Sequence, residues 1–293
     1  MVFQFFLTNG KWYYSHHKTQ RFRTIIVDQS GKGNFSSIQA AIDYVPKHNK
    51  NWVYINIKAG EYREKVVIPG DKPHIILKGE AKRKTKIVWD DHSTTDQSPT
   101  FTVLAHYTIA LCITFVNSYN FPKSNNPEVP AVAAMIKGDK CVFYRCGFQG
   151  MQDTLWDNRG RHYFKRCTIQ EVRGGGFITA QGRKSPSSTS GFVFKWCKVF
   201  GWGSAYLGRP WRDYARSNFT YVVNPKGWDP WETKGGKEDL VTFQEVENYG
   251  PGANTTQRVS WINRMSIHDT KELTSLSFID QDNWVRQMPI NLK

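Results

Sequence analysis

The sequence predicts an all-β protein, a single-stranded right-handed parallel β-helix (solenoid) with a short N-terminal capping helix. Glycine (23 residues) and aromatic residues (14%) are plentiful while amphipathic helical stretches are scarce, which is typical of short strands joined by tight turns. A pattern of aromatic, two variable residues, cysteine, one variable residue and an apolar residue occurs three times, at Phe143–Phe148, Phe164–Ile169 and Phe194–Val199.

The spacing of this repeat favours stacked coils. Cys146, Cys167 and Cys197 follow one another at steps of 21 and 30 residues, and Ile113–Asn117 resembles an earlier, weaker copy. A period of about 20 to 50 residues marks repeat architectures in which each unit buries a face on its neighbour. Because side chains alternate along a strand, each cysteine and the following apolar residue are predicted to point inward. An ordinary β-sandwich with similar strands is the alternative.

The segment Asn34–Pro46 predicts the capping helix. Asn34 or Ser36 can cap its N-terminus, and Pro46 ends it. Such a helix would cover the first coil, whose unpaired edge otherwise invites aggregation. Its apolar positions share one face: Phe35, Ile38, Ile42 and Val45.

Two further segments predict architecture. Gly60–Glu64 is expected to be a turn into a strand at Lys65–Ile68. Phe177–Gln181 is expected to be a strand that ends in a polar turn. With 293 residues and 39% hydrophobic content, the chain can bury one large core. We therefore predict one β-helix domain over 24–293, and an N-terminal extension over 1–23 that is either disordered or the remnant of a leader peptide.

The charge balance predicts a polyanionic partner. A net charge of +15 and a pI near 9.6 concentrate anions around the protein. The basic residues are scattered singly and in pairs, without a basic arm or helix, so an acidic polysaccharide is favoured over nucleic acid. A nucleic-acid binder stays as the weaker alternative. The N-terminal stretch MVFQFFLTNGKWYYSHH is a poor secretory signal, and no segment is long enough to span a bilayer.

The five cysteines predict neither a metal site nor a disulfide framework. Their number is odd and no Cys-x-x-Cys pair occurs, so buried thiols are expected. We expect no metal and no organic cofactor. Glycan acceptor triplets, used only on the secretory route, occur at three positions: Asn34, Asn218 and Asn254.

One candidate site segment combines an amide, a carboxyl and an aromatic ring. Gln152, Asp153 and Trp156 follow directly after a repeat strand and precede the turn at Asn158–Gly160, which is a position typical of a cleft. The structural alternative for Asp153 is a solvated or turn-capping carboxylate.

A second candidate segment is Tyr206–Arg212. Arg209 can hold a carboxylate by two parallel hydrogen bonds, while Trp211 can stack on a sugar ring or bind a cation. A salt bridge and a core tryptophan are the structural alternative.

Six stretches in the same order resemble the plant pectin methylesterases, or pectinesterases, over nearly the whole chain. They read VDQSGKGNFSSIQAAIDYVP, AGEYREKVVIP, GFQGMQDTLWDNRGRHYFKRCTIQ, GFITAQGR, AYLGRPWRDYARSNFTY, and the tail from ENYGPGANTTQRVSW to FIDQDNW. The resemblance implies a right-handed parallel β-helix that removes methyl groups from cell-wall homogalacturonan (pectin) and releases methanol. It also implies a secreted, monomeric cell-wall glycoprotein of pectin catabolism that proteinaceous inhibitors can bind.

The resemblance also implies roles for individual residues. Asp153 would be the general acid that protonates departing methanol, and Gln152 would help to hold the oxyanion. Arg209 would bind the nucleophilic carboxylate of an aspartyl esterase and Trp211 the sugar, while Trp156 would border the groove. We therefore expect Asp153 and Arg209, distant in the chain, to meet across the stacked coils.

Two departures from the family pattern bear on activity. Family members carry a DFIFG segment, whose Asp is the nucleophile, shortly after the counterpart of Cys167–Gln170, and no DFIFG occurs here. The missing piece corresponds to about one coil, and the flanking coils can restack because each contacts only its neighbours. Pro130 stands where many relatives have a Gln that serves as another oxyanion donor, and proline offers no such donor.

These departures predict impaired catalysis. A covalent route needs a carboxylate near the ester carbonyl, an oxyanion donor and an acid, and only the last two have clear candidates. Loss of one member of such a set costs on the order of 10⁴ to 10⁶ in turnover. Glu171, the nearest acidic residue at the junction, is a candidate substitute nucleophile. The alternative function is a non-catalytic pectin-binding protein.

Overall fold

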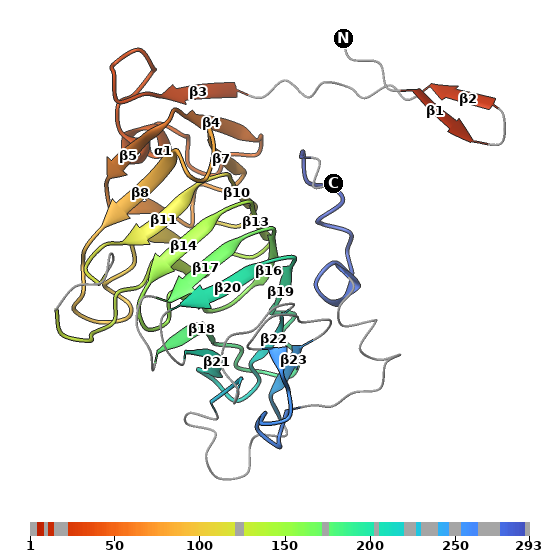
Figure 1. Cartoon of the computed structure of the whole chain (residues 1–293). Helices are drawn as coiled ribbons and strands as arrows, with labels where there is room; N and C mark the ends of the chain where they lie inside the picture. The colour runs from red at the N-terminus through yellow and green to blue at the C-terminus, as the bar shows by residue number, and fades with distance from the viewer. Residues whose placement is uncertain are drawn as a thin grey trace.

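The computed structural model describes residues 5–8, 11–14, 23–120, 126–171, 176–201, 205–219, 227–229, 240–245, 253–262 and 276–290. Within them, parallel strands stack coil upon coil into a solenoid (Figure 1), which confirms the predicted β-helix. Three parallel sheets run along the solenoid, and successive strands of the chain visit the three sheets in turn. The three sheets enclose the main hydrophobic core.

The bounds of the strands follow the sheet order. The first sheet contains β3 (Arg23–Val27), β4 (Val53–Ile57), β7 (Ile75–Gly79), β10 (Thr108–Leu111), β13 (Cys141–Tyr144), β16 (Arg161–Lys165), β19 (Gly191–Lys195), β22 (Arg216–Phe219) and β23 (Thr242–Glu245). The second contains β5 (Gly60–Arg63), β8 (Thr85–Trp89), β11 (Thr114–Asn117), β14 (Gly147–Gly150), β17 (Thr168–Glu171) and β20 (Lys198–Gly201). The third contains β6 (Val66–Ile68), β9 (Phe101–Val103), β12 (Ala134–Ile136), β15 (Leu155–Asp157), β18 (Phe177–Gln181) and β21 (Tyr206–Pro210).

Each copy of the cysteine repeat forms a corner between the first and second sheets. The residue before each repeat cysteine is left-handed, with φ of 54° at Arg145, Arg166 and Trp196. This residue turns the chain between two strands, so each copy of the repeat spans a corner. Cys146 and Cys167 still point inward and are buried, as predicted.

The interior of these coils is built from aligned side chains. The rings of Phe143, Phe164 and Phe194 stack on one another, with centroid separations of 5.0 and 4.5 Å. All five cysteines are free thiols, of which Cys112 is half-buried and the other four are buried. The expectation of buried thiols is confirmed for those four.

The capping helix α1 runs from Ile38 to Asp43 and packs against β3, β4 and β6. Ser37 caps it by accepting a hydrogen bond from the Ala40 N–H, so the prediction of Asn34 or Ser36 as the cap is wrong. The Asn34 side chain instead accepts from the Ile26 N–H at 2.8 Å. Most of Gly60–Glu64, expected to be a turn, is the strand β5, whereas the strand at Phe177–Gln181 is confirmed as β18.

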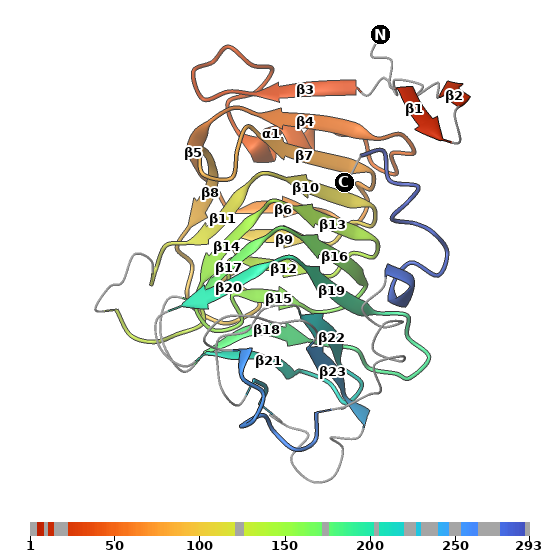
Figure 2. The same ribbon diagram turned by 45° about the vertical axis from the view of Figure 1, so that its right-hand side comes forward.

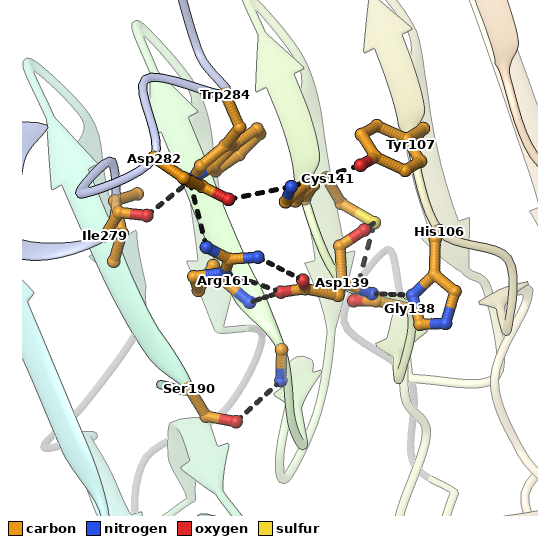
Figure 3. Close-up of polar contacts among 12 residues, drawn as sticks. His106, Tyr107, Gly138, Asp139, Cys141, Arg161, Ser190, Ile279, Asp282 and Trp284 are labelled. Atoms are coloured by element: carbon orange, nitrogen blue, oxygen red, sulfur yellow. Dashed lines mark hydrogen bonds and ion pairs between the residues drawn. The ribbon is translucent and has the colours of Figure 1, made fainter. Parts of the chain in front are cut away.

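The C-terminal segment 276–290, which begins with a 3₁₀ helix at Leu276–Phe278, covers the outer face of the first sheet (Figure 2). Phe278 and Trp284 belong to the same apolar cluster as Ile109 and Val142 of that sheet. Asp282 binds Lys140 at 2.8 Å and Arg161 at 3.0 Å, and Arg161 also pairs with Asp139 (Figure 3). This segment therefore covers the outer face of the first sheet and leaves the second and third sheets uncovered by it.

At the N-terminus, β1 (Phe5–Thr8) and β2 (Lys11–Tyr14) pair as an antiparallel hairpin. The domain boundary at residue 23 stays a prediction. Across the described ranges, no helix is long and apolar enough to cross a membrane. The same ranges hold no cluster of three or more His, Cys, Asp or Glu side chains that could bind a metal.

Candidate functional site

The first site segment is a strained turn between β14 and β15. Gln152 and Asp153 are both left-handed, with φ of 48° and 58°. Such a conformation costs on the order of 1 to 3 kcal/mol at a non-glycine residue, so neighbouring groups must hold it in place. The Asp153 N–H donates to the Phe177 carbonyl at 2.7 Å, and the Gln152 N–H donates to Glu171 Oε1 at 2.9 Å.

The structure brings Asp153 and Arg209 together, as expected, although 56 residues separate them in the chain. Arg209 Nε donates to Asp153 Oδ1 at 3.0 Å, and Nη2 donates to Oδ2 at 2.5 Å. Strand β18 lies between β15 and β21, so the guanidinium reaches over β18 to the carboxylate. Both side chains are buried, at 0% and 1% exposure. Burial raises the pKa of Asp153, and the ion pair with Arg209 opposes that rise only in part.

Aromatic rings surround this ion pair. The Arg209 guanidinium carbon lies 4.5 Å from the ring centroid of Phe177 and 4.9 Å from that of Trp211. The rings of Trp156 and Trp211 are 5.9 Å apart at an interplanar angle of 63°. Lys137 Nζ lies 5.1 Å from the ring centroid of Trp156. The two tryptophans therefore meet at one place, which the sequence predicted only as separate contacts to a sugar.

A cavity of about 770 Å³ opens beside the two tryptophans. Its described lining includes Trp156 and Trp211 but not Gln152, Asp153 or Arg209, which lie behind it. The sequence reasoning missed the cations of this lining, because isolated basic residues in turns carry no recognisable pattern. Those cations are Lys137, Arg159, Arg183, Lys184 and Arg212.

Glu171, at the end of β17, supports the strained turn from beneath. Its Oε2 contacts the Thr154 hydroxyl at 2.5 Å, in addition to the bond from Gln152. Burial raises its pKa to about 8, although both of these hydrogen bonds oppose the rise. A buried, protonated carboxyl is a poor nucleophile, so this geometry argues against Glu171 as a substitute. Residues 172–175 of the junction lie outside the described residues.

A basic cavity lined by two tryptophans on a parallel β-helix is a site of the kind that suits an acidic sugar polymer. The chain belongs to the pectinesterase family. The Pectinesterase family model matches residues 24–174 and 172–282. The resemblance seen in the sequence is therefore confirmed, and the family to which the chain belongs is a family of enzymes.

The relatives agree with this assignment. Probable pectinesterase 29 of Arabidopsis thaliana is 49% identical over 301 residues, covering 91% of this chain and 90% of the relative. Probable pectinesterase 55 of the same plant is 48% identical over 303 residues, covering 92% of each. The solved pectin methylesterase from carrot matches with a TM-score of 0.76 at 27% identity, covering 92% of this chain and 97% of that one.

A further solved structure agrees at the level of the fold. A pectin methylesterase in complex with a hexasaccharide matches with a TM-score of 0.65 at 19% identity. That match covers 88% of this chain and 97% of the other.

Proposed function

We propose that this chain binds methyl-esterified homogalacturonan in the cavity beside Trp156 and Trp211 and hydrolyses its methyl esters at a strongly reduced rate. The observation that carries the proposal is the bidentate pair between Arg209 and Asp153 directly behind those two tryptophans. A pyranose ring stacks on an indole, while basic side chains attract the carboxylates of galacturonate. The neighbour solved with a hexasaccharide supports a sugar-binding site in this fold.

Without the nucleophile, the site still contains a candidate acid and a candidate oxyanion donor. Asp153 is the candidate acid, and it can give a proton to departing methanol only when it is protonated and released from Arg209, which in this structure donates to both of its oxygens. Gln152 is half-buried beside it and would donate to the oxyanion. Residue roles in this proposal follow from the resemblance to the family and from this placement.

Three observations support the loss of a segment between Gln170 and Phe177. No DFIFG occurs in the sequence, and the two family matches meet at residues 172–174. The alignments to the two Arabidopsis relatives span 301 and 303 positions, more than the 293 residues of the whole chain, so the relatives carry residues that this chain lacks. The lost piece would include the strand with the nucleophilic Asp.

The ion pair is the expected result of such a loss. Removing one coil brings β21 one strand spacing, about 4.8 Å, closer to β15. The guanidinium that would have held the nucleophile then binds the acid Asp153 instead. Without a carboxylate nucleophile, a water molecule has to attack the ester carbonyl directly as the bond to methanol breaks, and turnover falls by about 10⁴ to 10⁶.

The second candidate function is pectin binding without any turnover. It is favoured by the burial of both Asp153 and Arg209, which keeps them out of the described cavity lining. Both candidates place the protein in the cell wall as a secreted monomer, with glycans at the three acceptor triplets and with inhibitor proteins as further partners. These properties are proposed from the family.

The test measures methanol release from methyl-esterified homogalacturonan beside retention of the protein on that polymer. Slow release that Asp153→Asn abolishes supports the esterase. Retention without release selects the binding protein, provided that Trp211→Ala weakens the retention. Neither release nor retention would refute both functions.

A further inference from the structure

A basic surface lies at the corner between the first and second sheets, away from the cavity. It consists of the exposed Arg145 and Arg166, the half-buried Lys195 and the exposed Trp196, and we name it the basic corner; Lys165 is buried against it. The strand register places Lys165 beside Lys195, while Arg145, Arg166 and Trp196 occupy the same left-handed position of three successive coils. The third sheet, which carries Trp156 and Trp211, forms a different side of each coil.

Trp196 is an exposed aromatic platform within this corner. Half of its surface is open to solvent (50%). Three cations approach its ring: Lys165 Nζ lies 4.8 Å from the ring centroid, and Arg166 Cζ and Lys195 Nζ each lie 5.4 Å from it. The exposed half of this ring lies among cations, and an indole ring with cations beside it offers a sugar acid both a stacking surface and partners for its carboxylate.

The cations of the corner differ from those elsewhere on the surface. Arg145, Arg166 and Lys195 form no ion pair with an acidic side chain in the described part of the chain. By contrast, Arg63 and Lys65 of the earlier coils pair with aspartates at 2.5 Å. The corner therefore carries positive charge that the described acidic side chains do not neutralise.

The like charges in the corner also affect one another. The pKa of Lys165 is lowered, first by burial and then by the charges of Lys195 and Arg166. Because successive coils are about 4.8 Å apart, the corner presents its cations at a regular spacing along the solenoid. An extended polymer with one carboxylate on each sugar ring matches such a row better than a compact anion does.

We propose that the basic corner is a second binding surface, which takes unesterified stretches of homogalacturonan. The cations would bind the carboxylates by charge-assisted hydrogen bonds, and Trp196 would stack on a sugar ring. The inference rests on the proposed function for the identity of the polymer. It adds that the protein holds the acidic product form at a place separate from the cavity that takes the ester.

The test measures binding of an unesterified oligogalacturonide by isothermal titration calorimetry in a Trp211→Ala background, which weakens the contribution of the cavity. The corner variant Arg166→Glu with Lys195→Glu is expected to weaken binding roughly a hundredfold, about tenfold for each charged contact. The matched control is Lys32→Glu with Lys50→Glu, two exposed cations of the first coils. The control changes the net charge equally and is expected to leave binding within about twofold of the parent, since distant surface charges are screened.

A second variant separates sugar recognition from charge alone. Trp196→Ala is expected to weaken the oligogalacturonide roughly tenfold and to leave binding of inorganic polyphosphate unchanged. The proposal would be overturned if the corner and control variants lost equal affinity for the oligogalacturonide. It would also be overturned if single-stranded DNA or polyphosphate bound as tightly as the oligogalacturonide.

The two proposals fail separately. If wild-type protein does not bind the methyl-esterified oligomer but the unesterified one binds at the corner, the proposed function fails and this inference stands. If the esterified oligomer binds through Trp211 while the corner variant keeps full affinity for the unesterified one, this inference fails alone.

Discussion

Glu171 gives the protein a pH dependence that a single substitution should remove. Its carboxyl is buried, and its pKa of about 8 in the folded protein compares with 4.5 for an exposed glutamate. Between those two pH values the folded protein holds more protons than the unfolded chain, so stability falls as pH rises. The difference between the two pKa values corresponds to a loss of up to about 5 kcal/mol, complete above the higher pKa.

Glu171→Gln should reproduce the protonated form at every pH. The amide oxygen can still accept from the Gln152 N–H, and the amide nitrogen can donate to the Thr154 hydroxyl. Urea unfolding followed by tryptophan fluorescence should therefore show nearly equal stabilities at about pH 4, where both forms are uncharged. By about pH 9 the Gln variant should be the more stable by several kcal/mol.

A second variant tests the hydrogen bonds without the charge. Glu171→Ala removes the acceptor for Gln152 and the partner of Thr154, so it should destabilise the protein by about 1 to 3 kcal/mol even at low pH. The reasoning would be refuted by a stability difference between wild type and Glu171→Gln that does not change with pH, or by one that shrinks as pH rises.

Three further predictions concern the pair, the tail and the core. Arg209→Ala should cost about 3 to 5 kcal/mol in urea unfolding because it leaves the buried Asp153 without its cation; a cost below about 1 kcal/mol would contradict the buried pair. Asp282→Asn should cost at most about 1 kcal/mol at neutral pH, since the aspartate is 46% exposed. Lys140 and Arg161 lower the pKa of Asp282 in the folded protein. The stability that this carboxylate contributes is therefore present above its pKa in the unfolded chain, and it should disappear as the pH falls through its pKa in the folded protein. Phe164→Ala should lower the free energy of unfolding by about 3 to 5 kcal/mol, whereas Phe200→Ala should be nearly neutral because Phe200 is 44% exposed. Similar losses of stability in the two variants would contradict the stacked core.

The solenoid was predictable because its repeat is local. The order of aromatic, cysteine and apolar residue recurs within six positions, so the inward-facing Cys146, Cys167 and Cys197 could be assigned from alternation alone. The corner at Arg145 could not be assigned in this way. An arginine rarely adopts a left-handed conformation, and it does so here because neighbouring coils impose the same turn.

The candidate site was predictable in its members but not in its geometry. The family resemblance assigned Asp153 and Arg209 to one site, yet their direct bidentate contact depends on how many strands separate β15 from β21. The role of Glu171 depends on burial, which is a property of the assembled coils. A sequence pattern records neither the number of intervening strands nor the solvent that a carboxyl has lost.

We propose that this member of the pectinesterase family binds its polymer in the cavity beside Trp156 and Trp211 and lacks the coil that supplies the nucleophile. The most direct test is a graft between Gln170 and Phe177. The inserted segment is the one that lies between the two matching positions in probable pectinesterase 29 of Arabidopsis. Methanol release from methyl-esterified homogalacturonan should then rise by about 10⁴ or more over the present chain. A grafted protein that unfolds cooperatively and binds the polymer, but releases methanol no faster, would contradict the account.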